Sequence, residues 1–113
     1  MLPYLAEGLR LFQDGQYFLS HETLEEHWAE APEQDRNFYQ GLIHLAVGFL
    51  HYDKGNAKGA RLQFNKASKR LADYPDEYQQ VDLKEVRRFL DEAPDALEGG
   101  DPLVPPKLVK PVR

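Results

Sequence analysis

Glycine and proline divide most of this chain into segments of the length of an α-helix. Gly15, Pro32, Gly55 and Pro75 separate stretches of about 12 to 22 residues. Within these stretches apolar residues recur every three or four positions, which is the period of one helix face. Nearly every local signal is therefore helical, and the pattern predicts an all-α fold.

We expect five helices, the last of which begins with a capping-box variant at Asp82 and Glu85. The second should turn Phe18, Leu24 and Trp28 inward. The middle of the third, "GLIHLAVGFL", is apolar on all sides, which is typical of a buried central helix. The expected bounds, in chain order, are about 3–14, 16–31, 33–54, 57–74 and 82–94, with Pro94 ending the fifth helix.

The first four helices form an internal repeat with an offset of 40 residues. Gly8 aligns with Gly48, Gly15 with Gly55, and Leu24 with Phe64. Each half reads as a helix, a glycine turn and a second helix, which resembles a tetratricopeptide hairpin. Because such repeats need about three units to stand alone, we expect a compact array of two tetratricopeptide-like hairpins closed by the fifth helix.

Length and composition predict one domain followed by a tail. A chain of 113 residues can bury a single core, so we assign residues 1–98 to one helical domain. Residues 99–113 are rich in proline and glycine and form an extended tail, either flexible or laid across the body through Leu103, Val104 and Leu108. The chain has no cysteine, no signal-peptide pattern and no apolar run of about 18 residues. These features predict a cytoplasmic protein without a membrane anchor.

The stretch "SHETLEEHW" at 20–28 concentrates the residues that could carry chemistry. His21, Glu22 and Glu25 come one residue short of the His-Glu-x-x-His pattern of zinc peptidases. His21 and Glu25 are four apart, so they share a helix face and could both bind zinc, iron or manganese. His44 and His51 lie about 10 Å apart along the third helix, so only one could complete the site, and we choose His51.

Three interpretations of this cluster remain open. In one, His21, Glu25 and His51 bind a divalent metal and Glu22 is the base of a hydrolase-like enzyme. In a second, the cluster performs acid–base chemistry without a metal. In the third, which we favour, the histidine and the carboxylates border the core and satisfy each other by hydrogen bonds. Trp28 is then a core anchor.

Charge is distributed unevenly along the chain. Residues 1–53 carry nine acidic and two basic side chains, whereas residues 54–71 carry six basic and no acidic ones. The fourth helix should present a basic face through Lys58, Arg61, Lys66 and Lys69. Such a face could track phosphates or attract the acidic second helix. With a net charge of −5 and no aromatic loop among the bases, nucleic-acid binding is disfavoured.

These motifs together resemble the family called domain of unknown function 309. The resemblance covers most of residues 8–71 and includes a His-Glu-x-Leu-Glu-x-x-Trp motif, with Ser20 as a mild departure. It implies an all-helical fold with no established activity. It also implies that one polar cluster matters, consisting of His21, Glu22, Glu25, Trp28, Gln40 and His51.

The function expected from the sequence is a non-enzymatic interaction module that binds a protein partner or a second copy of itself. The tetratricopeptide-like hairpins, the uneven charge and the lack of a complete catalytic set favour it. The alternative is the metal-dependent enzyme described above.

Overall fold

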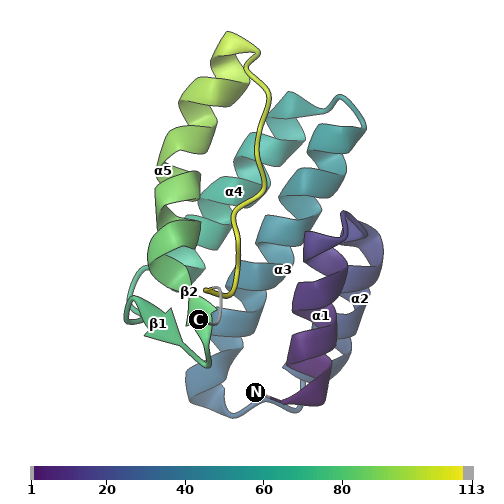
Figure 1. Ribbon diagram of the computed structural model, residues 1–113, viewed down its shortest axis with the longest axis vertical. Helices are drawn as coiled ribbons and strands as arrows, with labels where there is room; N and C mark the ends of the chain where they lie inside the picture. The colour runs from purple at the N-terminus through teal and green to yellow at the C-terminus, as the bar shows by residue number, and fades with distance from the viewer. Residues whose placement is uncertain (1, 111–113) are drawn as a thin grey trace.

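Residues 2–110, which the computed structural model describes, form an all-α fold of five helices, as predicted (Figure 1). A two-stranded antiparallel hairpin lies between the last two helices. No helix in this range is long and apolar enough to cross a membrane. The elements are α1 (Pro3–Gln13), α2 (Tyr17–Trp28), α3 (Glu33–Asp53), α4 (Ala57–Leu71), β1 (Glu77–Tyr78), β2 (Val81–Asp82) and α5 (Leu83–Gly99).

The first four helices pack as two hairpins, α1 with α2 and α3 with α4, and α3 also packs against α2. Gly15 and Gly55 make the two turns with φ of 79° and 76°, a backbone region that favours glycine. A Cβ atom on Gly8 would lie 2.7 Å from Leu24 Cδ2, and one on Gly48 would lie 2.6 Å from Phe64 Cδ1. The two pairs are equivalent in the 40-residue repeat, so both hairpins are closed by the same glycine contact.

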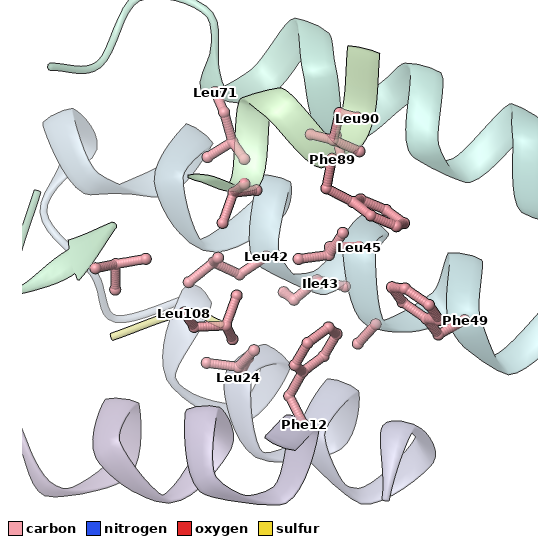
Figure 2. Packing of buried hydrophobic residues seen from close by; sticks show 14 of the residues in the cluster. Phe12, Leu24, Leu42, Ile43, Leu45, Phe49, Leu71, Phe89, Leu90 and Leu108 are labelled. Atoms are coloured by element: carbon pink, nitrogen blue, oxygen red, sulfur yellow. The ribbon is translucent and has the colours of Figure 1, made fainter. Parts of the chain in front are cut away.

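The core is an apolar cluster to which every helix contributes (Figure 2). Phe49 of α3 lies among four aromatic rings whose centroids are 5.1 to 5.6 Å away, and these belong to Phe12, Tyr17, Phe64 and Phe89. Because these rings come from α1, α2, α4 and α5, the aromatic packing fixes both hairpins and the closing helix to α3. The prediction that α3 is the central helix is confirmed.

Two predictions within the helices are wrong. Phe18 is 52% exposed, and the neighbouring Tyr17 is buried in its place. The prediction that Pro94 ends the fifth helix is also wrong, since α5 continues to Gly99. Burial of Ala93 and packing of Leu97 against the core favour the extra turns, and Gly100, at φ 73°, caps the helix.

The β-hairpin has no counterpart in the sequence-based expectations. Its turn places Gln79 and Gln80 at φ of 48° and 68°, conformations in which Asn and Gly are usual. Tertiary contacts hold it, because Val81 is fully buried and the Tyr78 hydroxyl donates a hydrogen bond to Asp35 of α3.

The tail lies across the body. After α5 it runs back over the face formed by α5, α3 and α1 (Figure 1). Leu108 is 1% exposed within the core cluster, whereas Val104 is 77% exposed. The Leu108 amide donates to the Gln13 side chain at 2.7 Å, and its carbonyl accepts from the Asp82 amide at 2.7 Å. The tail therefore joins α1 to the start of α5.

Candidate functional site

The His21–Glu25 pair is a contact within α2. His21 Nε2 lies 2.8 Å from Glu25 Oε2, and His21 Nδ1 lies 3.3 Å from the carbonyl oxygen of Phe18. Both ring nitrogens thus face acceptors on the same helix. Glu22 is exposed and has no hydrogen-bond partner among the described residues. The neutral ring donates from one nitrogen at a time, so α2 supplies His21 with an acceptor in either tautomer.

His51 lies at the end of α3 and belongs to the turn into α4. Its Nδ1 accepts a hydrogen bond from Asn56 Nδ2 at 3.2 Å, and Asn56 also caps α4 by accepting from the Gly59 amide at 2.9 Å. Within residues 2–110 no three histidine, cysteine, aspartate or glutamate side chains are grouped so that they could hold a metal ion. His21, Glu25 and His51 are therefore not brought together as a three-ligand set.

Trp28 and Gln40, the other members of the predicted cluster, lie in a recessed part of the surface. Two adjoining recesses of about 580 and 610 Å³ share Asn37, Gln40 and Arg70 as lining residues. We call this continuous surface the α3 groove. Its lining residues are Trp28, Ala31, Glu33, Arg36, Asn37, Gln40, His44, Lys66, Lys69 and Arg70.

The groove follows from helix spacing and a close helix contact. Asn37, Gln40 and His44 are three and four residues apart, so they form one stripe along α3. Next to them, a Cβ atom on Gly41 would lie 2.5 Å from Leu71 Cδ2. Because this glycine lets α4 approach closely, Gln40 and Arg70, the residues adjacent to that contact, line the same recess.

Four cationic side chains line the groove: Arg36, Lys66, Lys69 and Arg70. None of them has a carboxylate within ion-pair distance among residues 2–110. Glu33 is the one acidic residue in the lining. The groove is therefore a positively charged strip on a chain whose net charge is −5.

The arginines are held in place by neutral groups. Arg70 donates from Nη1 to Asn37 Oδ1 at 2.8 Å. The guanidinium of Arg36 lies 5.2 Å from the centroid of the Trp28 ring, a cation–π contact, and donates to the carbonyl of Ala29 at 3.0 Å. Trp28 is half-buried, and its indole nitrogen has no hydrogen-bond partner in the described part of the chain. It is thus both a core contact and a support for Arg36.

His44 is the histidine of the groove. Its Nδ1 donates to Gln63 Oε1 at 2.8 Å. Burial holds the pKa of His44 below its usual value, and the charges of Lys66 and Arg70 act in the same direction, while the bond to Gln63 opposes them. Burial is the main cause of the lowered pKa, and the two cations add to it.

The predicted basic face is divided between two surfaces. Lys66 and Lys69 line the groove, whereas Lys58 and Arg61 are exposed elsewhere on α4. Sequence reasoning missed Arg36, Asn37 and Arg70 as site residues. The spacing of 37, 40 and 44 was a readable signal of a polar stripe that continues from the polar start of α3 into its apolar middle.

Comparisons with known proteins agree with the resemblance. The chain is 28% identical over 99 residues to an uncharacterized protein of Aquifex aeolicus (strain VF5). This match covers 87% of the chain and 30% of that protein. It is 44% identical over 46 residues to the uncharacterized protein YpuF of Bacillus subtilis (strain 168). This match covers 40% of the chain and 26% of YpuF. The matched parts are less than a third of either relative. The family model named Domain of unknown function (DUF309) matches residues 5–62, and the chain belongs to this family.

Proposed function

We propose that this chain is a non-enzymatic interaction module and that a segment of a partner protein binds in its α3 groove. The observation that carries the proposal is the set of four cations in one recess, of which the two arginines are held by neutral groups. The two arginines suit the binding of an anionic surface, because their positions are fixed before the partner arrives.

The polar residues that suggested metal chemistry have structural partners instead. His21 contacts Glu25 and the backbone of its own helix, and His51 contacts the cap of α4. Both histidines stabilise local structure in this proposal. The groove, about which α2, α3 and α4 converge, is then the functional surface.

Site-specific photocrosslinking tests the proposal without assuming what the partner is. A benzophenone amino acid replaces Glu33, which is exposed and lines the groove, and in a matched control it replaces Glu26, which is exposed on α2 outside the lining. Each change removes one glutamate. In a lysate of the source organism we expect a discrete crosslinked protein from position 33 that is absent from position 26. Equal labelling from both positions, or none, would contradict the proposal.

A further inference from the structure

We infer that the ligand of the α3 groove is a short acidic peptide segment whose carboxylates bind Arg70, Lys66 and Lys69. This inference rests on the proposed function and names the chemistry of the partner.

The two arginines of the groove differ from three arginines elsewhere on the molecule in having no carboxylate partner among the described residues. Arg10, Arg87 and Arg88 each contact at least one carboxylate at 2.5 to 2.8 Å. In the described residues Arg36 and Arg70 contact only neutral oxygens. Arg61, on α4 outside the groove, also has no carboxylate partner among the described residues, so what distinguishes the groove is that two such arginines lie beside two lysines in one recess.

The donors have the geometry that carboxylates require. Asn37 occupies one nitrogen of the Arg70 guanidinium, and an arginine has five N–H donors in a rigid plane, which can bind a carboxylate through two parallel hydrogen bonds. Lys66 and Lys69 are exposed on α4, four residues and one residue before Arg70. Lysine supplies a mobile point charge. Lys66 or Lys69 can therefore pair with a second acidic side chain of the peptide over a range of positions.

The length of the groove indicates a short ligand. The α3 residues of its lining extend from Glu33 to His44. At about 1.5 Å per residue this is roughly 16 Å. An extended peptide advances about 3.3 Å per residue, so about five residues span the groove.

A peptide fits this surface better than a nucleic acid does. Single-stranded nucleic acids bind through bases stacked on aromatic side chains. Trp28 is the aromatic residue of the lining, and Arg36 already lies over its ring.

Fluorescence anisotropy at 150 mM salt tests the inference with three labelled probes. These are an octapeptide alternating glutamate and alanine, its glutamine counterpart, and an oligothymidylate of eight nucleotides. At this ionic strength exposed charges beyond about 8 Å are largely screened. We expect the glutamate peptide to bind at least about ten-fold more tightly than the glutamine peptide.

Variants locate the binding site. Arg70→Gln should weaken binding of the glutamate peptide by about ten-fold or more, because a charge-assisted hydrogen bond is lost. Lys66→Gln with Lys69→Gln should weaken it about three- to ten-fold. The control is Lys58→Gln with Arg61→Gln, which removes the same charge from α4 outside the groove and should change affinity less than about two-fold. Thermal melts confirm that all variants are folded.

Each other outcome overturns the inference in a distinct way. Equal binding of the two peptides, or equal loss with the control pair, shows that carboxylates are not read in the groove. If the oligothymidylate binds more tightly than the glutamate peptide, and the Lys66→Gln, Lys69→Gln variant loses that binding, the groove is assigned to nucleic acid. If the glutamate peptide fails while the crosslink from position 33 persists, the inference is wrong and the proposed function stands.

Discussion

Replacing Gly48 by alanine tests whether α3 and α4 are in as close contact as the structure indicates. The new Cβ would lie 2.6 Å from Phe64 Cδ1 and 3.0 Å from Cζ. Non-bonded carbon atoms prefer about 3.5 Å or more, so the ring or the helix would have to move by roughly 1 Å. Phe64 is 1% exposed and its ring contacts those of Phe49 and Phe89 at 5.3 and 5.2 Å. The ring therefore has little space into which it can move.

Two opposing free energies decide the result. Overpacking a closed core costs about 3 kcal/mol at the upper end of its usual range, whereas alanine in place of glycine inside a helix gains about 1 kcal/mol. We expect Gly48→Ala to lower the free energy of unfolding by about 2 kcal/mol, measured by urea denaturation. The melting temperature should fall by about 8 °C or more.

A control and a double mutant separate the contact from the effect of the backbone. Gly99 ends α5, and a Cβ atom there would meet only the Asp101 side chain, at 3.3 and 3.8 Å, so Gly99→Ala should not destabilise the fold. In a Phe64→Leu background, Gly48→Ala should cost at least about 1 kcal/mol less than in the wild type. If Gly48→Ala instead stabilises the protein by the helix-propensity gain alone, the close contact does not exist and the reasoning fails.

Four further outcomes are expected. Trp28→Ala should cost about 2 kcal/mol in urea denaturation, because the side chain is half-buried; a change within error would place it outside the core. Leu108→Ala should cost about 3 kcal/mol, since the side chain is 1% exposed; an unchanged stability would show that the tail is not docked. Burial and nearby cations lower the folded-state pKa of His44. The contribution of neutral His44 to the free energy of unfolding is therefore complete above the unfolded-state pKa of about 6.5, and it is lost as pH falls through that value toward the folded-state pKa. His44→Gln should therefore lose less stability than the wild type between pH 7.5 and 5.5, and parallel losses would contradict this. His21 and Glu25 should show a coupling below about 1 kcal/mol in a double-mutant cycle, with equal metal content by elemental analysis in wild type and His21→Ala; a stoichiometric ion lost with His21 would restore the metal hypothesis.

The helices could be predicted because their signals are local. Apolar spacing and the breaks at Gly15, Pro32 and Gly55 define α1 to α4 within a few residues. The exact rotation of α2 could not be predicted, since Tyr17 and Phe18 are adjacent and either could face the core. Only the packing of Tyr17 against Phe12 and Phe49 decides between them.

Features that depend on tertiary contacts could not be predicted from the local sequence. An interior proline costs a helix about 3 kcal/mol, and whether the helix continues past Pro94 depends on the apolar contacts that Leu97 can make. The turn at Gln79 and Gln80 has no glycine or asparagine, so no local signal announced it.

The candidate site was predicted in part. Gln40, Trp28, Lys66 and Lys69 were named from sequence, but not as one surface. Lys66 and Lys69 come close to Gln40 because α4 approaches α3 at Gly41. That approach is a contact between Gly41 and Leu71, which are 30 positions apart in the sequence. Arg70 was not among the residues named, and its sequence position beside Lys69 gives no indication that it lines a recess.

The docking of Leu108 has a consequence for the order of folding. The hydrogen bond between Leu108 and Gln13 joins residues 95 positions apart, whereas the two helical hairpins are closed by contacts 16 residues apart at Gly8–Leu24 and Gly48–Phe64. Local contacts form early, and distant ones wait because the loop that they close is costly in entropy. The hairpins can therefore form during synthesis, while α1 gains its last neighbour only when the tail has been made. Amide exchange at Leu108 and along α1 should accordingly share one opening event, distinct from that of α3 and α4.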